Sequence, residues 1–237
     1  MKDLLSIVIP SKNEKHTIYE CLRYINNQFN IQGIKVIIAD ISDDTISKEV
    51  LEKSKSEFTN LYIEIIEGGY PAKGRLEGSK LVRTPFILFL DADVMLKDEY
   101  IIFYLLKNIT NNKYIHLITV PFETDKKWNW VFRMFDISQN ISKWIGTPFA
   151  VGGFQLWRTT EYWRVGGYNP DEVFAEDYSI TSKVKSRNFY INKKLKVYTS
   201  PRRFENKGFI FMFRLLLLSF LNRNNPEFFK KHHNYWK

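Results

Sequence analysis

Short apolar runs alternate with one-sided apolar patterns along the first part of the chain. Residues 4–9 form an apolar run that ends at Pro10, and residues 35–39 form a second, rich in β-branched side chains. Both runs are predicted to be buried strands. Between them, residues 17–28 have apolar side chains at positions 18, 21, 22 and 25, the spacing of a helix with one apolar face. The pattern predicts a β-α-β unit.

The alternation continues as far as Asp93. The sequence predicts a helix at 49–58, a strand at 62–66, a helix at 76–82 and a strand at 86–90. Strands that alternate with helices in this way form a mostly parallel sheet with helices on both faces. The fold class expected is therefore α/β.

Beyond Asp93 the pattern is less regular. The elements expected there are a helix at about 98–109, a strand at 116–121, a Trp-rich amphipathic stretch at 128–145 and a helix at about 175–186. A strongly apolar segment at 209–221 contains Arg214, and its 13 residues are too few to span about 30 Å of hydrocarbon. We expect this segment to lie on a membrane rather than cross it.

The composition of the 237 residues, 44% hydrophobic and 26% charged, is ordinary for a globular protein with one sizeable core. A single cysteine, Cys21, excludes a disulfide framework and a Cys-rich zinc site. The first residues lack a basic region followed by an apolar signal segment, so a cytoplasmic location is expected.

The formal net charge of +9 is concentrated near the end of the chain. Residues 202–237 contain eight Lys or Arg and two Glu, a net charge of +6. Together with aromatic residues, these charges suit an amphipathic helical tail on an anionic membrane surface, peripheral to the inner face. The same residues could instead close the core as a final helix or form a dimer contact. We expect a catalytic domain at 1–205 and this tail at 206–237.

The strand at 86–90 ends in Asp91-Ala92-Asp93. Open parallel sheets bind ligands at the C-terminal ends of their strands, and alternation places Asp91 and Asp93 on the same side. Two neighbouring carboxylates repel each other unless a cation such as Mg²⁺ or Mn²⁺ joins them, and that ion could neutralise a diphosphate. The alternative is a solvated turn at the end of a strand.

Polar residues also follow the first two strands, at 11–14 and 40–45. Adjacent strand ends form a crevice, in which Asp40 could accept the N–H of a nucleotide base. The alternative is that Asn13, Asp44 or Ser47 simply cap helices.

The order of these motifs resembles that of the family 2 glycosyltransferases, inverting enzymes of the GT-A fold, over about residues 4–205. The matching segments are 6–14, Asp40 with Ser42, Asp44 and Thr45, 72–75, 88–93, Gly152–Gly153, 165–170 and 174–177. The chain departs from the family at Gly74-Arg75-Leu76, where Ala-Arg-Asn is common.

The resemblance implies a role for each matching residue. Asp91 and Asp93 would form the metal-associated motif, Asp177 of the Glu176-Asp177 pair would be the general base, and Gly152 and Gly153 would lie beside the reacting sugar. The residues expected to contact the nucleotide are Pro10, Ser11, Glu14, Asp40, Arg75 and Asp91.

The chemistry accounts for these residue types without the family name. An inverting transfer needs a base opposite the leaving group, while a metal ion stabilises the departing diphosphate. The alternative for Glu176 and Asp177 is a pair of acids at the start of a helix, where the helix dipole favours them.

The segment 198–204 resembles a Ser-x-Arg-Arg element of some family 2 members. The guanidinium groups of Arg202 and Arg203 would contact the diphosphate, with a solvated basic turn as the alternative. Many GT-A enzymes use a late histidine as a metal ligand. Here the candidates His232 and His233 could take that role only if the tail folds back.

These observations predict a metal-dependent glycosyltransferase. UDP-sugar is the first candidate donor and GDP-mannose the second, and the acceptor is a hydroxyl compound, with a lipid-linked molecule as one candidate. No nucleic-acid partner is expected. The alternatives are a nucleotidyltransferase of related fold or a non-catalytic protein that binds nucleic acid or membranes.

Overall fold

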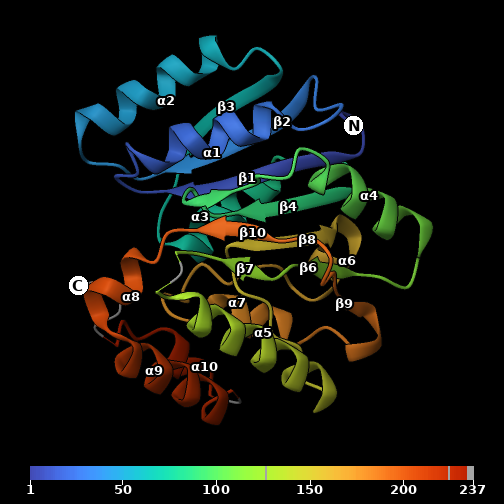
Figure 1. Ribbon diagram of the computed structural model, residues 1–237, viewed down its shortest axis with the longest axis vertical. Coiled ribbons are helices and arrows are strands. Elements are labelled where there is room, and N and C mark those ends of the chain that lie inside the picture. The colour runs from blue at the N-terminus through green and yellow to red at the C-terminus, as the bar shows by residue number, and fades with distance from the viewer. Residues whose placement is uncertain (126, 224, 234–237) are drawn as a thin grey trace.

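The computed structural model describes residues 1–125, 127–223 and 225–233 (Figure 1). The side chains of Arg203, Phe204, Met212 and Leu216 lie outside that description. Residues 234–237, the end of the expected tail, do so as well.

A mostly parallel sheet forms the centre of the molecule. In the described part of the chain its strand order is β3-β2-β1-β4-β8-β6-β9. Strands β1 to β4 run parallel, whereas β8 is antiparallel to both of its neighbours. The strands are β1 (Leu5–Ser11), β2 (Ile34–Asp40), β3 (Leu61–Glu67), β4 (Phe86–Leu90), β8 (Phe154–Arg158), β6 (Leu117–Thr119) and β9 (Phe189–Ile191).

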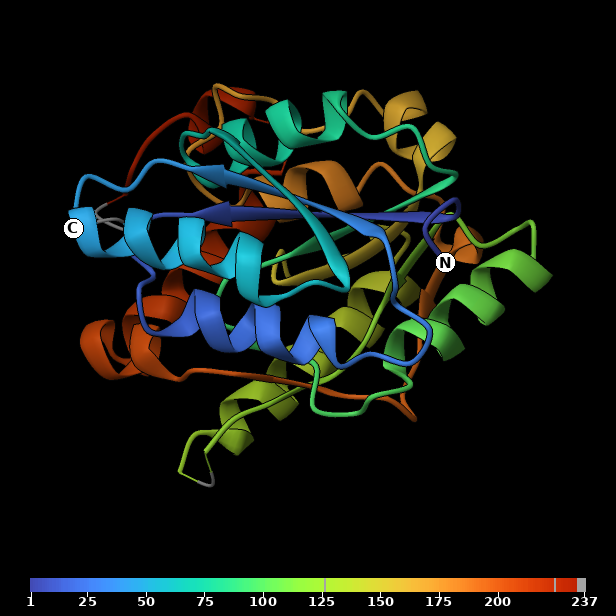
Figure 2. The ribbon, with the colours of Figure 1, turned by 90° about the horizontal axis from the view of Figure 1, so that it is seen from above.

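Strand β4 is apolar along its whole length, and β1 and β2 along most of theirs, because both faces of the sheet are covered. Alternate side chains point to opposite faces. Ile7 and Ile9 pack into one hydrophobic cluster with helix α1, while Val8 and Ile37 pack into another with α3. Figure 2 shows α1 and α2 on one side of the sheet and α3 on the other.

Helices connect and follow these strands. The helices are α1 (Thr17–Asn26), α2 (Thr45–Glu57), α3 (Pro71–Lys80), α4 (Ile101–Asn111), α5 (Asn129–Trp144), α6 (Thr159–Arg164), α7 (Glu176–Thr181), a 3-10 turn η1 (Ser186–Asn188), α8 (Arg202–Lys207), α9 (Phe209–Leu221) and α10 (Pro226–Phe229). A small second sheet joins β5 (Val94–Met95), β10 (Val197–Thr199) and β7 (Phe122–Glu123) in the order β5-β10-β7. Among the described residues, none of the helices has both the length and the apolar character to cross a membrane.

Two helices differ most from their predicted bounds. The helix predicted at 76–82 begins earlier, at Pro71, because proline suits the first turn of a helix. The helix predicted at about 175–186 ends at Thr181. After Ser182 the backbone N–H groups donate three residues back instead of four, as the Val184 N–H does to the Thr181 carbonyl at 3.0 Å, so the α-helical pattern gives way to tighter turns.

The segment after residue 205 packs against the rest of the molecule (Figure 1). Leu215 and Ser219 of α9 are buried. Phe229 of α10 is also buried, in a cluster with Phe149 and Tyr178. The C-terminal helices therefore contribute to the core, and the division at residue 205 stays a prediction.

Candidate active site

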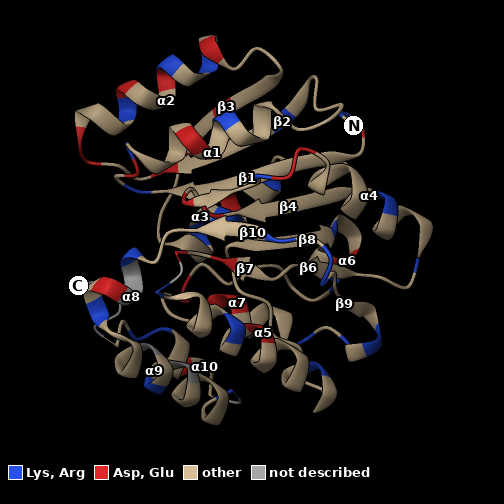
Figure 3. Cartoon of the chain, viewed as in Figure 1, with Lys and Arg blue, Asp and Glu red and all other residues tan. Residues whose placement is uncertain are grey.

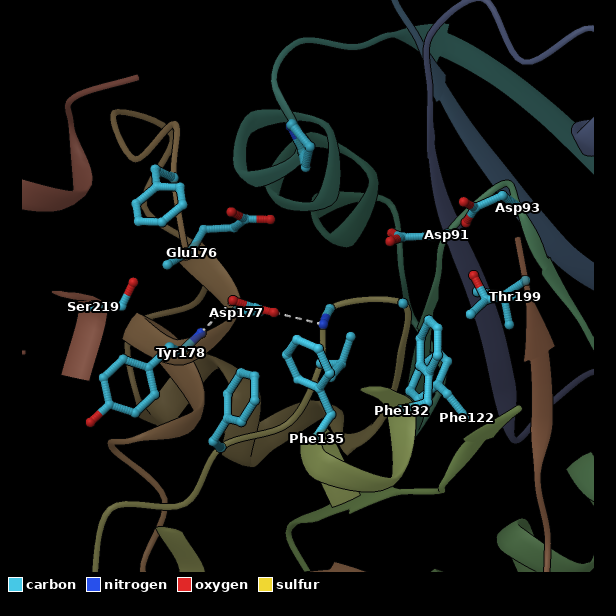
Figure 4. A pocket seen from close by; sticks show the side chains of 18 of the residues that line it. Asp91, Asp93, Phe122, Phe132, Phe135, Glu176, Asp177, Tyr178, Thr199 and Ser219 are labelled. Carbon is cyan, nitrogen blue, oxygen red and sulfur yellow. Dashed lines mark hydrogen bonds between the residues drawn. The ribbon is translucent and has the colours of Figure 1, made fainter. Parts of the chain in front are cut away.

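A cavity of about 190 Å³ lies beyond the C-terminal end of β4. Figure 4 shows Asp91 and Asp93 on one side of it, Asp177 on another, and Phe122, Phe132 and Phe135 between and below them. The lining residues come from the sheet ends and from α3, α5, α7 and α9: Pro71, Arg75, Asp91, Asp93, Val94, Phe122, Phe132, Phe135, Phe149, Val151, Gly152, Gly153, Phe174, Ala175, Glu176, Asp177, Tyr178, Thr199, Ser200, Leu215 and Ser219.

Arg75 of α3 joins two carboxylates in the wall of this cavity. Its Nη2 lies 2.5 Å from Asp91 Oδ1 and its Nη1 lies 2.6 Å from Glu176 Oε1. The Arg75 side chain is only 2% exposed. Burial by itself would lower the pKa of Arg75, but the negative charges of Asp91 and Glu176 hold that pKa well above its usual value. The guanidinium thus stays charged and fixes the end of β4 to the start of α7.

Asp177 is the second residue of α7, directly after Glu176, and backbone N–H groups hold its carboxylate. Gly152 N–H donates to Oδ2 at 2.9 Å, and Tyr178 N–H donates to Oδ1 at 2.8 Å. Burial, and then the charge of Glu176, raise the pKa of Asp177 to about 7, against the lowering effects of the Gly152 N–H and of Arg75. A carboxyl with a pKa near neutral can exchange a proton at physiological pH.

The backbone before Asp177 is held from the C-terminal side of the chain. Ala175 has φ of 48°, a left-handed conformation that is unfavourable for a residue with a Cβ. Just before it, the N–H groups of Val173 and Phe174 donate to the Phe229 carbonyl at 3.0 and 3.2 Å. Helix α10 therefore fastens the loop that presents Asp177.

Asp91 and Asp93 fit a metal site of a particular kind. Mg²⁺ typically takes one or two carboxylates from the protein and completes its coordination with substrate phosphates and water. Both carboxylates line the cavity, and no group of three or more His, Cys, Asp or Glu in the described part of the chain is placed to hold a metal. Cys21 is buried beside these residues, its thiol donates to the Asp91 carbonyl at 3.8 Å, and burial, and then the charges of Asp93 and Asp91, raise its pKa. The two carboxylates would supply part of the coordination of such an ion.

The polar residues after β1 and β2 come together, as adjacent strand ends must, with Ser11 paired in register with Asp40. The Ser42 hydroxyl donates to Asp40 Oδ1 at 2.7 Å and accepts the Asn13 N–H at 2.8 Å. Asp44 caps α2, because its carboxylate accepts the N–H of Ser47. Helix capping was one of the alternatives for the polar residues in this segment.

These strand-end residues flank the cavity rather than line it. Pro10, Ser11, Glu14 and Asp40 are not among its lining residues. The Ser11 hydroxyl is buried, and no described residue hydrogen-bonds to it.

Arg202 and Glu14 form an ion pair, with Nη2 and Oε1 2.5 Å apart. This contact brings the Ser-x-Arg-Arg segment to the end of β1, although Arg202 does not line the cavity. The expected role of Arg203 falls on a side chain outside the described residues.

The tail folds back against the body of the molecule, but neither of its histidines is among the residues that line the cavity. The ring of His232 lies 5.1 Å from that of Tyr70. Tyr70 directly precedes Pro71, which lines the cavity. The ring of His233 lies 5.1 Å from that of Phe174.

Sequence reasoning missed the aromatic part of the cavity wall. Phe132 and Phe135 lie on α5, whose amphipathic pattern indicated a helix but not which face would line a cavity. Leu215 and Ser219 were assigned to a membrane segment, yet they line the same cavity. Motif spacing carries no signal for such residues.

Comparison with known proteins agrees with this geometry. The sequence model for "Glycosyl transferase family 2" matches residues 6–166, about two-thirds of the chain. The chain belongs to glycosyltransferase family 2. The family and the GT-A fold expected from the motifs are thereby confirmed.

Relatives of this family 2 glycosyltransferase share its sequence over a limited region. The poly(ribitol-phosphate) beta-glucosyltransferase of Bacillus spizizenii is 29% identical over 98 residues, which are 40% of this chain and 16% of that protein. The match covers less than a quarter of the length of the curated relatives.

Two solved structures share the fold. TarS of S. aureus, residues 1–349 in complex with UDP-GlcNAc, superposes with a TM-score of 0.67 at 18% identity, over 83% of this chain and 58% of that one. Mannosyltransferase PcManGT from Pyrobaculum calidifontis, in complex with GDP-Man and Mn²⁺, superposes with a TM-score of 0.69 at 13% identity, over 99% of this chain and 69% of that one.

Proposed function

We propose that this family 2 glycosyltransferase moves a sugar from a nucleoside-diphosphate sugar to a hydroxyl group of an acceptor, with inversion at the anomeric carbon. The observation that carries the proposal is the position of Asp177, with a pKa of about 7, across one cavity from Asp91 and Asp93. Inversion requires a base on the face of the sugar opposite the leaving group. Carboxylates on different sides of one cavity can serve the two ends of that reaction.

In this proposal Asp177 accepts the proton of the acceptor hydroxyl. The N–H groups of Gly152 and Tyr178 orient its carboxylate, and Gly152 and Gly153 line the cavity in which the reacting sugar would lie. Glu176 is tied to Arg75, so its proposed role is to position the guanidinium and to raise the pKa of Asp177 rather than to take the proton.

The donor side of the site would be formed by Arg75, Asp91 and the ends of β1 and β2. Pro10, Ser11 and Asp40 would hold the nucleoside, and the buried Ser11 hydroxyl supports a contact there. Glu14 and Arg202 are paired beside them, and a diphosphate would compete with Glu14 for the guanidinium. Arg203 is proposed to assist Arg202.

The fold relatives support two donor classes. TarS was solved with UDP-GlcNAc and PcManGT with GDP-Man, so UDP-sugars are the first candidates and GDP-mannose the second.

The proposed cofactor is Mn²⁺ or Mg²⁺, held by Asp93 and Asp91. PcManGT was solved with Mn²⁺, and the paired carboxylates suit such an ion. When bound, the ion would neutralise charge on the departing diphosphate.

The acceptor would enter along the aromatic part of the cavity. Phe122, Phe132, Phe135, Phe149 and Phe174 give this wall an apolar surface. Such a wall suits an acceptor with an apolar face, and a lipid-linked hydroxyl compound is one candidate. A lipid-linked acceptor would require a peripheral position on the inner face of a membrane, with residues 206–237 as the anchor.

Calorimetric titration with nucleotides tests this function. We expect UDP or GDP, and the matching nucleotide sugar, to bind in the presence of Mn²⁺ and to bind much more weakly with EDTA. Asp93→Ala should weaken the Mn²⁺-dependent binding at least about tenfold, which corresponds to about 1.4 kcal/mol. Asp3→Ala, an exposed aspartate elsewhere, is the matched control.

Two results would count against the proposal. If a folded Asp93→Ala variant binds the nucleotide with unchanged affinity in Mn²⁺, then Asp93 does not hold a metal ion against the donor. Absence of binding by every nucleotide and nucleotide sugar tested would remove the transferase function itself.

A further inference from the structure

Helix α5 carries an apolar stripe on its outer surface. Trp130, Met134, Ile137, Ile141 and Trp144 are all exposed, and Trp144 is 86% exposed. Their spacings of four and three residues place them along one side of the helix. The opposite side of α5 faces the core, so this helix is apolar on two sides.

Helix α9 carries a second stripe of the same kind. Ile210, Phe213, Leu217 and Leu221 are exposed, with Ile210 82% exposed, and they also follow a spacing of three and four residues. Like α5, this helix uses its other side for the interior.

An aromatic contact joins the two stripes. The rings of Trp130 and Phe209 lie 4.6 Å apart, and those of Phe209 and Phe213 lie 5.7 Å apart in a stacked arrangement. All three side chains are partly exposed. Figure 1 shows α5 and α9 at the same end of the molecule. We call the two joined stripes the α5–α9 face.

Basic residues accompany the α5–α9 face. Arg133 on α5 and Arg214 on α9 are exposed, and Arg223 follows α9. Helix α5 contains two basic residues and one acid, and α9 contains Arg214 and no acid. Figure 3 shows Lys and Arg along the C-terminal helices.

We propose that the α5–α9 face docks on an anionic phospholipid bilayer, with both helices lying in the interfacial plane. Contiguous exposed apolar surface marks an interaction site, and apolar stripes with Trp, Phe and flanking Arg are typical of helices that lie on a membrane. The positive charge complements anionic headgroups. A second copy of this chain would instead bring the same basic residues together, and like-charge repulsion opposes that pairing.

The docking face and the cavity share the same two helices. Phe132 and Phe135 of α5 and Leu215 and Ser219 of α9 line the cavity, while other sides of these helices form the face. If the proposed function holds, docking would bring the acceptor wall of the cavity to the bilayer. Docking itself does not depend on catalysis and is measured separately from donor binding.

Co-sedimentation with vesicles tests the proposal. Wild-type protein should bind vesicles of phosphatidylglycerol and phosphatidylcholine, less with rising salt, and bind phosphatidylcholine alone weakly. Trp144→Glu/Ile210→Glu should lower the partition coefficient at least about tenfold, since it removes two large apolar contacts. Arg133→Gln/Arg214→Gln should weaken binding to the anionic vesicles only.

Matched variants control for charge and folding. Tyr62→Glu/Tyr114→Glu adds the same charge at side chains that are 62% and 66% exposed elsewhere, and should bind like wild type. Lys48→Gln/Lys107→Gln removes two exposed charges outside the face and should change little. Circular dichroism confirms that each variant is folded.

Three outcomes would overturn the docking proposal. Wild-type protein could stay in the supernatant with anionic vesicles at low salt. The Trp144→Glu/Ile210→Glu variant could bind as well as its Tyr62→Glu/Tyr114→Glu control. The face could also prove to be a contact between copies, shown by a dimer that Trp144→Glu/Ile210→Glu dissociates and by absence of vesicle binding.

Discussion

At the scale of single residues, the site depends on the buried Arg75, which forms ion pairs with two carboxylates. Arg75 contacts Asp91 after β4 and Glu176 at the start of α7, which are far apart in the sequence. Its charge also lowers the pKa of Asp177. One side chain thus links the donor side of the cavity to the candidate base.

Replacing Arg75 should destabilise the fold even when the positive charge is kept. A lysine has one ammonium group and cannot hold two carboxylates in the forked geometry of a guanidinium. We expect Arg75→Lys to lower the free energy of unfolding by about 3 kcal/mol, the usual effect of disrupting a buried ion pair. Urea denaturation measures this, with the exposed Arg83→Lys as control. Equal stability of the two variants would show that the bridge contributes little.

At the scale of elements, α5 holds a carboxyl that its surroundings do not favour. Asp136 is half-buried, its Oδ1 has no hydrogen-bond partner among the described residues, and burial raises its pKa from 3.8 to about 6. A carboxyl with a raised folded pKa leaves the fold unaffected while it is protonated in both states. It destabilises the fold increasingly as pH rises from 3.8 to about 6, and fully above that.

Asp136→Asn should therefore stabilise the protein in a pH-dependent way. We expect the free energy of unfolding to rise by about 1 kcal/mol at pH above 6, less than the full pKa shift would give because the side chain is partly solvated. Near the unfolded pKa the gain should largely vanish. Thermal unfolding across pH measures this, with exposed Asp171→Asn as control. A gain that does not change with pH would contradict the assignment.

Helix α10 has a role that its length of four residues does not suggest. Phe229 is buried against Phe149 and Tyr178, and its carbonyl holds the loop before Asp177. Phe229→Ala should lower the free energy of unfolding by about 3 kcal/mol or more. It should also reduce turnover more than donor binding. The neighbouring Phe228→Ala, at a less buried side chain, should cost less, and equal losses would argue against this role of α10.

At the scale of the whole molecule, the sequence predicted the half of the fold that follows local rules. The apolar runs at 4–9, 35–39 and 86–90 form adjacent parallel strands. A continuous apolar run indicates a strand that is buried on both faces. The carboxylates that follow β4 were placed from this pattern alone. Contacts between distant segments could not be predicted this way: the Arg75 bridge joins residues that are 16 and 101 positions apart.

The C-terminal helices show the same limit. The apolar pattern at 209–221 predicts a membrane surface element, and one side of the helix that forms there is exposed. Its other side lines the cavity, which only the packing of α9 beside α5 and α7 reveals. Periodicity indicates that a helix has an apolar face but not which neighbour covers it.

The central claim is that Asp177 is the base of a glycosyl transfer in this cavity. The most direct measurement is the rate of nucleotide release from the donor that binds, across pH and with Mn²⁺, for wild type, Asp177→Asn and the control Asp171→Asn. We predict that the wild-type rate rises as pH passes about 7, because the base must be deprotonated, and then levels off. Asp177→Asn should bind donor normally but turn over about 10² to 10⁴ times more slowly, while Asp171→Asn behaves like wild type. Near-normal turnover by a folded Asp177→Asn variant, with an unchanged pH profile, would contradict the account.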